Sequence, residues 1–257
     1  MKKLTLILLA FVLVASACKK DDEEEDENKL EPTSQQRGFA INYTATWCGP
    51  CGNWGAPLIH SYAHDAPHGA VITCHASGDP MHIASLDASF KSDRETGGGI
   101  PAFWVGDTKG TGANLMKDLI KSGSAKAGVD FSFEKDGGKM TVKTMTKFFS
   151  PTPGEYYLSV LLLENGIDGS SSAGSYKQNG VSNPDTYKHD FVLRSSSVDM
   201  NSYGELIASS PSDGKTVEKT YTFTIDPSWK NVYPVAIIWR KEVGAKPEFK
   251  FVNSYKK

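Results

Sequence analysis

The sequence predicts a mixed α/β domain followed by an all-β antiparallel sandwich, both behind an export leader. Three features support this: an apolar run at the N-terminus, strands alternating with helices over residues 37–127, and alternating strands without helical signals over residues 128–257. Of the 257 residues, 39% are hydrophobic and 23% charged, as in soluble globular proteins with an ordinary core. This length suits one large domain or two ordinary ones.

Residues 1–17 have the features of an export signal. Two lysines precede an apolar run, Leu4–Val14, which is shorter than the roughly 20 residues of a membrane-spanning helix. Small residues directly before Cys18 resemble a lipobox, so we expect cleavage and lipidation at Cys18. The alternative is ordinary cleavage after Ala17. The mature chain is expected to be an outer-membrane lipoprotein held by its lipid, facing the periplasm or the cell exterior.

Residues 18–36 are predicted to be a disordered tether. The acidic run Asp21–Glu27 repels itself and has no apolar face to bury. A lysine-plus-acid run after the lipidated cysteine is similar to the surface-export signal of some Gram-negative lipoproteins, and a solvated spacer explains it almost as well. The formal net charge of −2 gives no support for a nucleic-acid partner.

The α/β part, residues 37–127, alternates short apolar runs with amphipathic stretches. A glycine triplet, Gly97–Gly99, breaks the chain before the third run. The predicted strands are Gly38–Tyr43, Ala70–Cys74 and Ile100–Val105, and the predicted helices extend from the cysteine motif to about Ala63, over Met81–Arg94 and over Asn114–Ser122.

The β part, residues 128–257, begins with a predicted hairpin. Apolar and polar residues alternate on both sides of the turn Asp136-Gly137-Gly138. Seven or so short strands separated by Ser, Gly, Asn and Pro clusters fit a β-sandwich. The further predicted strands are Glu155–Leu163, Thr186–Arg194, Val217–Ile225, Val232–Trp239 and Glu248–Ser254.

A Cys-x-x-Cys pair between a strand and a helix is the feature that carries chemistry. The helix start stabilises a thiolate on Cys48, which would attack a substrate disulfide, and Cys51, one turn later, would resolve the mixed disulfide. Pro50 suits the helix start, and Trp47 is expected to shape the contact surface. The alternatives are a structural disulfide or half of a zinc site. No second ligand pair is present, so neither a metal nor a cofactor is expected.

Two stretches together resemble the thioredoxin family. They are the run Trp47-Cys48-Gly49-Pro50-Cys51 and the later loop Gly99-Ile100-Pro101-Ala102-Phe103. The resemblance implies a thioredoxin-like fold over residues 37–127. It also implies a cis Ile100–Pro101 bond, with Pro101 facing the cysteine pair and the loop presenting backbone to the substrate.

The chain departs from the thioredoxin pattern at two positions. Asn42 stands where thioredoxins keep a buried acid that helps to deprotonate the second cysteine, and Gly52 stands where they commonly have lysine. Asn42 can orient a water but cannot take up a proton at neutral pH. The resemblance therefore supports disulfide exchange more firmly than efficient disulfide reduction.

Two other groups of reactive side chains have a structural and a functional interpretation. Cys74 is either a buried inert thiol, which we favour, or a third redox partner. His60, His64 and His68 are spaced by four and would share a helix face, but Pro67 interrupts that helix, so surface histidines are favoured over metal ligands.

The whole mature chain also resembles the twenty-eight-kilodalton outer-membrane lipoprotein family. The resemblance rests on the stretches Tyr187–Arg194 and Tyr203-Gly204, together with the leader and the thioredoxin-like half. It implies an N-terminal thioredoxin-like domain and a C-terminal β domain, and some members are described as surface adhesins.

Two functions follow as hypotheses. The first is a membrane-anchored thiol–disulfide oxidoreductase that acts on disulfides or dithiols of exported proteins through Cys48 and Cys51. The alternative is a surface-exposed interaction or adhesion lipoprotein that uses the thioredoxin-like half as a scaffold.

Overall fold

The computed structural model describes residues 29–170 and 176–257, so the leader and Cys18 lie outside the described residues. Among the described residues, no helix combines the length and the apolar character needed to cross a membrane. The first half contains β1 (Phe39–Thr44), η1 (Cys51–Gly55, a π-helical turn), α1 (Ala56–Asp65), β2 (Ala70–His75), α2 (Ala84–Asp93), β3 (Ala102–Val105), β4 (Thr108–Lys109) and α3 (Leu115–Ile120). The second half contains β5 (Ala127–Asp136), β6 (Lys139–Phe148), β7 (Glu155–Asn165), β8 (Ile167–Asp168), β9 (Lys188–His189), β10 (Val192–Ser196), β11 (Glu205–Ser209), β12 (Thr216–Thr224), β13 (Asn231–Lys241) and β14 (Phe249–Tyr255).

The first half forms one side of a large mixed sheet. β1 lies between β2, with which it pairs in parallel, and β3, with which it pairs antiparallel. η1 and α1 make the crossover from β1 to β2, and α1 ends at Asp65, before Pro67, as the sequence predicts. Every residue of β1 and β2 is buried, which explains why both read as continuous apolar runs.

Strands of the second half extend this same sheet. The sheet runs in the order β14-β13-β7-β10-β2-β1-β3-β4, with β11 also paired to β7. β10 pairs antiparallel with β7 on one side, and on the other it pairs in parallel with β2 where Val192 faces Thr73. Strands from both sides of the boundary predicted between residues 127 and 128 therefore belong to one sheet.

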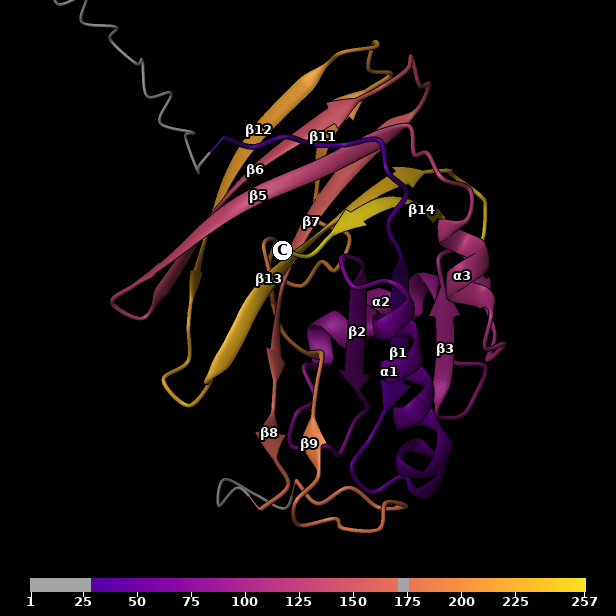
Figure 1. Ribbon diagram of the computed structural model, residues 1–257, viewed down its shortest axis with the longest axis vertical. Coiled ribbons are helices and arrows are strands. Elements are labelled where there is room, and N and C mark those ends of the chain that lie inside the picture. Colours follow the sequence, from indigo (N-terminus) through magenta and orange to yellow (C-terminus); the bar gives the residue numbers. More distant parts are fainter. Residues whose placement is uncertain (1–28, 171–175) are drawn as a thin grey trace, which may run out of the picture.

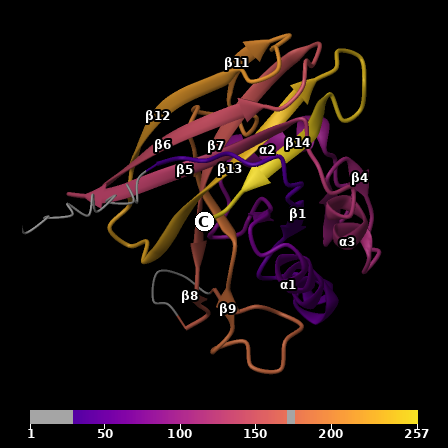
Figure 2. The same ribbon diagram turned by 45° about the horizontal axis from the view of Figure 1, so that its top comes forward.

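A second, three-stranded sheet in the order β12-β6-β5 packs on β7 and β13. Figure 1 shows β7 and β13 between this layer and the helical part, and the turned view of Figure 2 shows β5, β6 and β12 as a layer of their own. The β5–β6 hairpin turns at Gly137 and Gly138, both at positive φ, as the sequence predicts. The sandwich thus consists of a small sheet and part of the large one.

β7 explains why the two parts share a core. Successive side chains of a strand point to opposite faces of its sheet. Leu162 is buried against the three-stranded sheet, whereas Leu161 and Leu163 are buried against the helical side. An apolar run of this kind needs cover on both faces, and the two halves of the chain supply one cover each.

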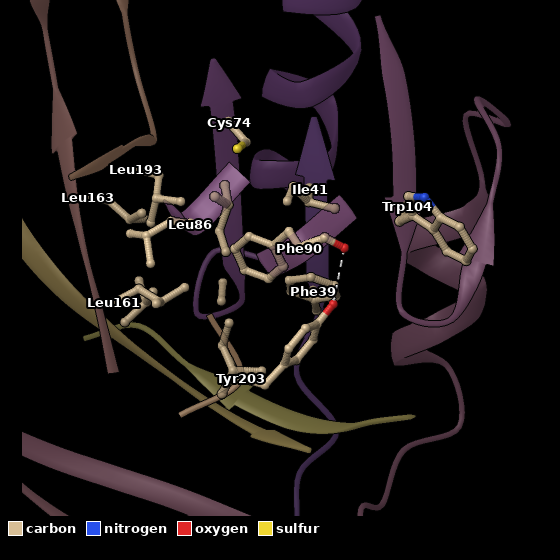
Figure 3. Packing of buried hydrophobic residues seen from close by; sticks show 14 of the residues in the cluster. Phe39, Ile41, Cys74, Leu86, Phe90, Trp104, Leu161, Leu163, Leu193 and Tyr203 are labelled. Carbon is tan, nitrogen blue, oxygen red and sulfur yellow. Dashed lines mark hydrogen bonds between the residues drawn. The ribbon is translucent and has the colours of Figure 1, made fainter. Parts of the chain in front are cut away.

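The core on the helical side contains residues from both halves (Figure 3). Phe39 contacts the fully buried Trp239 edge to face, with ring centroids 5.0 Å apart. The Tyr203 hydroxyl donates a hydrogen bond to the Phe90 carbonyl at 3.4 Å. Aromatic contacts between remote segments therefore join α2 and β1 to the C-terminal strands.

Arg94, at the end of α2, is a fully buried charge at this junction. Its guanidinium donates to the Asp107 carboxylate at 2.7 Å and to the Phe249 carbonyl at 2.7 Å. It also lies 4.7 Å from the centre of the Trp239 ring. Because a buried charge is costly unless it is paired, these contacts make the position of α2 depend on β13 and β14.

The end of the predicted disordered tether is ordered in the structure. Gln35 bridges to Ser124, the Ala125 N–H donates to the Ser34 carbonyl at 2.6 Å, and Thr33 approaches Gly128 so closely that a Cβ there would collide with its carbonyl. The prediction that the tether extends to residue 36 is therefore wrong at its C-terminal end, because those backbone groups find partners beside β5.

The segment Thr186–Arg194, predicted as one strand, forms two strands instead. Phe191 has a φ of 61° and separates β9 from β10. Its N–H donates to Asn165 Oδ1 at 2.7 Å, and Asp190 Oδ1 accepts the Gly166 N–H at 2.8 Å. Side-chain acceptors thus replace ladder hydrogen bonds at this break.

We expect a fragment of residues 29–127 to fail to fold on its own, although the sequence suggests a separate domain. The fragment loses the Trp239 ring that packs on Phe39 and Arg94 and the Phe249 carbonyl that accepts from Arg94, and it exposes the buried edge of β2. Urea unfolding followed by circular dichroism should show no cooperative transition for the fragment and one transition for residues 29–257. A cooperative transition in the fragment would contradict the shared core.

Candidate functional site

The two cysteines of the motif form a disulfide where β1 is followed by a helix. Pro50 precedes η1 with a φ of −58°, which suits a helix start. The Cα atoms of Cys48 and Cys51 lie 5.2 Å apart, and the Cys51 N–H donates to Cys48 Sγ at 3.2 Å. After reduction, this N–H and the helix start would favour a thiolate on Cys48.

The loop before β3 lies against the disulfide. The Ile100–Pro101 bond is cis, as the resemblance to thioredoxins implies. The Ile100 carbonyl oxygen is 3.7 Å from Cys48 Sγ. Pro101 packs against η1 so closely that a Cβ at Gly55 would lie 3.0 Å from the proline side chain. The structure thus brings together the two motifs that the sequence indicates.

Two tryptophans present apolar surface beside the disulfide. Trp47 is 52% exposed and Trp54 is 41% exposed, whereas Cys48 is 5% exposed and Cys51 1% exposed. Trp54 lies against Phe103, the residue two after the cis-proline, with ring centroids 5.9 Å apart. Sequence reasoning missed Trp54, because an aromatic residue on a helix is most often a core residue.

Asp79 holds the loop that carries Trp47 through side-chain hydrogen bonds. Asp79 Oδ2 accepts the Thr46 N–H at 2.6 Å, and its Oδ1 accepts the Met81 N–H at 2.8 Å. His75 Nδ1 lies 3.0 Å from Asp79 Oδ1, and neither side chain is exposed. Burial by itself would raise the pKa of Asp79, but His75 and these N–H groups outweigh it and lower the pKa well below its usual range.

A segment of the second half, residues 176–181, fixes the same loop from the other side. We call it the cover segment. Gln178 Nε2 donates to the carbonyls of Ala45, at 3.2 Å, and Cys48, at 3.1 Å. The Asn179 N–H donates to the Thr46 carbonyl at 2.7 Å. In both ribbon views the β8–β9 ribbon, which flanks the cover segment in sequence, lies at the end of the molecule where α1 is found (Figures 1 and 2).

The close contact between the cover segment and the motif explains why residues 52 and 180 are glycines. A Cβ at Gly52 would collide with the Asn179 carbonyl oxygen, and a Cβ at Gly180 would collide with the Gly49 carbonyl. Gly180 also has a φ of 84°. The lysine that thioredoxins commonly have at the position of Gly52 would therefore not fit under this segment.

Asn42 lies behind Cys51, as the resemblance to thioredoxins implies. It is 2% exposed, in the middle of β1 between Thr73 of β2 and Phe103 of β3. Its Oδ1 finds no hydrogen-bond donor among the residues that the structure describes. A cavity of about 20 Å³ is lined by both Asn42 and Cys51.

His189 of β9 lines that same cavity. Its ring is 5.7 Å from the His75 ring and 4.8 Å from the Tyr187 ring. Burial, and next the nearby His75, lower the pKa of His189 to about 4, so it is neutral at pH 7. In the sequence, His189 is notable only as part of Tyr187–Arg194, one of the stretches that carry the resemblance to the outer-membrane lipoprotein family. Nothing local in the sequence distinguishes it from a surface histidine.

The remaining candidates lie apart from the disulfide. Cys74 is buried, and burial raises its pKa well above the ordinary value, which confirms the interpretation as a buried thiol. His64 has a side chain that is 91% exposed, and His68 contacts the Lys256 carbonyl. No group of three possible metal ligands is present within residues 29–170 and 176–257.

Gly52→Ala should destabilise the oxidised protein by about 1–3 kcal/mol, because the new methyl group forces the cover segment away from the motif. Gly49→Ala is the matched control, since a Cβ at Gly49 meets nothing within 4 Å. Urea unfolding of both variants at pH 7 measures the difference. Equal stability of the two would show that the cover segment is not held this closely.

The stability of the protein should fall between pH 6.5 and pH 4 because of His189. Its pKa is about 4 when folded and about 6.5 when unfolded, so in this range the unfolded chain binds the extra proton and is favoured. The loss is on the order of 3 kcal/mol over the range. Urea unfolding at several pH values gives the free energy of unfolding as a function of pH. This free energy should fall less steeply with falling pH in His189→Gln than in the wild type, and as steeply as in the wild type in His64→Gln, the control at an exposed residue. An unchanged slope in His189→Gln would contradict this assignment.

Comparison with known proteins adds a likeness of fold. No protein-family model matches the sequence, and no curated protein matches it. The chain is similar to the solved structure of HBP35 of Porphyromonas gingivalis, with a TM-score of 0.68 and 16% identity over 87% of this chain and 75% of that chain. A domain of the outer membrane lipoprotein Omp28 from Porphyromonas gingivalis matches 51% of this chain and 95% of its own at 20% identity, but with a TM-score of only 0.31. The chain therefore shares a sheet-rich fold with HBP35.

Proposed function

We propose that the protein is a thiol–disulfide oxidoreductase and that residues 37–127 are a thioredoxin-like unit built into the larger sheet. The observation that carries the proposal is the Cys48–Cys51 disulfide at a helix start, with the Ile100 carbonyl 3.7 Å from Cys48 Sγ. A backbone segment beside the attacking sulfur offers a place for an extended substrate.

The proposed exchange uses the two cysteines in order. In the reduced protein, the Cys48 thiolate attacks one sulfur of a substrate disulfide, which forms a mixed disulfide and releases the other substrate sulfur as a thiolate. Cys51 then attacks Cys48 Sγ, which forms Cys48–Cys51 and releases the second substrate thiolate. Two electrons pass to the substrate, and the reverse sequence oxidises a substrate dithiol. The slightly greater exposure of Cys48 fits its role as the attacking group.

The proposed substrates are protein disulfides or dithiols in the cell envelope. Trp47 and Trp54 provide exposed apolar surface on which a polypeptide can pack beside the disulfide. We further propose that Cys18 carries the lipid that holds the protein at the outer membrane. The leader and the small residues before Cys18 support this part of the proposal.

One observation favours the alternative of an interaction lipoprotein with a static disulfide. The cover segment donates hydrogen bonds to all four backbone carbonyls from Ala45 to Cys48, and it packs against Gly52. A disulfide enclosed in this way would serve as a staple for the loop, and Trp47 would then be a contact residue for a partner.

Trapping of the mixed disulfide separates the two functions. Residues 19–257 carrying Cys51→Ser are incubated with glutathione disulfide, and the adduct is located by mass spectrometry. We expect the adduct on Cys48 to form at least about tenfold faster than any adduct on Cys51 in the matched variant Cys48→Ser, because a thiolate is favoured only at Cys48.

The wild-type protein should also reduce insulin in the presence of dithiothreitol. If neither the Cys48 adduct nor insulin reduction is observed, the oxidoreductase function is contradicted and the static disulfide is favoured. An adduct on Cys74 in place of Cys48 would contradict the assignment of the attacking group.

A further inference from the structure

The small cavity behind Cys51 joins three remote parts of the chain. Asn42 comes from β1, Thr73 from β2, and Tyr187 and His189 from the second half, and all of them line it together with Cys51. Its volume is about 20 Å³, which is enough for one water molecule. The cavity is therefore a place where a proton can pass between Cys51 and a neighbouring side chain.

The amide of Asn42 cannot be the group that takes this proton. Its Oδ1 is a buried acceptor without a donor among the described residues, and it is suited to orient a water in the cavity. An amide holds no further proton at neutral pH. The titratable side chains that line the cavity besides Cys51 are His60, Tyr187, His189 and Asp190. Asp190 is already engaged, since its Oδ1 accepts the Gly166 N–H and its Oδ2 lies 3.7 Å from His60 Nε2.

The hydrogen bonding of His189 leaves one ring nitrogen able to accept a proton. His189 Nε2 lies 2.6 Å from the Tyr176 carbonyl oxygen. A carbonyl oxygen only accepts hydrogen bonds, so Nε2 carries the hydrogen of the neutral ring and Nδ1 holds the lone pair. Tyr176 belongs to the cover segment, which thus sets the tautomer of His189 as well as the position of the cysteine loop.

Charged and titratable groups surround His189 on several sides. His75 and Asp79 lie on the side of β2, Tyr187 stacks edge-on, and Arg194 follows on β10. In the oxidised protein, burial and His75 hold the ring neutral, and Asp79 opposes them. A thiolate forming across the cavity would favour the imidazolium in the same way that paired cysteine and histidine side chains favour each other's charged forms.

We propose that His189 accepts the Cys51 proton during the resolving step, in the place of the acid that thioredoxins keep at the position of Asn42. This inference rests on the proposed disulfide exchange and names the residue that enables its second half. The second half of the chain, through His189, thus supplies the proton acceptor for Cys51 of the first half.

The step balances in atoms and charge. The Cys51 thiol gives its proton through one water to His189 Nδ1, and the resulting thiolate attacks Cys48 Sγ. The Cys48–Cys51 bond forms, and the bond from Cys48 to the substrate sulfur breaks. The departing substrate thiolate takes up a proton from solvent, and His189 returns its own proton to solvent, which restores the neutral ring.

The test follows the decay of the mixed disulfide. Residues 19–257, reduced with dithiothreitol and freed of it, are mixed with excess glutathione disulfide, quenched with acid at set times and weighed by mass spectrometry. Formation and decay of the glutathione adduct on Cys48 are measured between pH 5 and pH 9 for wild type, His189→Gln, His60→Gln and the double variant Asn42→Asp/His189→Gln.

We expect His189→Gln to slow decay of the adduct at pH 7 by at least about tenfold and to regain rate as the pH rises, because solvent base then deprotonates Cys51. Adduct formation by Cys48 should change by less than about twofold. His60 lines the same cavity with a half-exposed side chain, and His60→Gln should resemble wild type. The double variant should recover the rate at pH 7, which a misfolded protein could not do.

Three results would overturn the inference. If the Cys48 adduct decays as fast in His189→Gln as in the wild type at every pH, His189 takes no proton. A loss in His60→Gln in place of His189→Gln would assign the role to His60. Absence of a Cys48 adduct in Cys51→Ser, together with no Cys48–Cys51 disulfide formed from the reduced wild type, would contradict the disulfide exchange itself and the inference with it, so this failure is distinguishable from the first two.

Discussion

The pairing of β10 with β2 is the contact on which the rest of the structure depends. At this point Val192 meets Thr73, and the Thr73 N–H donates to the Phe191 carbonyl at 2.7 Å. A buried strand edge has no water to satisfy its backbone groups, so β2 needs a neighbour on this side. β10 supplies one, and through β7 it connects the helical part to the three-stranded layer. The large sheet is continuous because of this contact.

The same contact places the second half of the chain around the cysteine motif. β9 directly precedes β10, and the cover segment precedes β9 by only a few residues, so fixing β10 on β2 carries both to the end of β1. Gln178 then reaches the carbonyls of Ala45 and Cys48. The loop before Cys48 is thereby held by Asp79 on one side and by the cover segment on the other, so the Thr46 N–H and the carbonyls from Ala45 to Cys48 have partners within the protein.

Buried polar groups at this site cost stability, as the buried Arg94 does at the junction of the two halves. Asp79 and His75 are taken out of water as a close pair, and His189 remains uncharged at pH 7. Apolar residues would fill the same space at lower cost. The proposed disulfide exchange would give these groups a use, since a thiol that must lose its proton inside the protein needs a fixed water and a base nearby.

Local sequence determined most of the individual elements and the centre of the site. Period-two and apolar patterns located β1, β2 and the β5–β6 hairpin, and Pro67 marked the end of α1. The cis Pro101 facing Cys48 was implied by the resemblance to thioredoxins, which local sequence alone could not show. Only the tertiary structure decided that the halves share one sheet, that Gly52 must be small, and that His189 lies behind Cys51. These features depend on contacts between residues more than 100 positions apart, such as Gln178 with Cys48. Periodicity and spacing carry no record of such contacts, because they report only on neighbours along the chain.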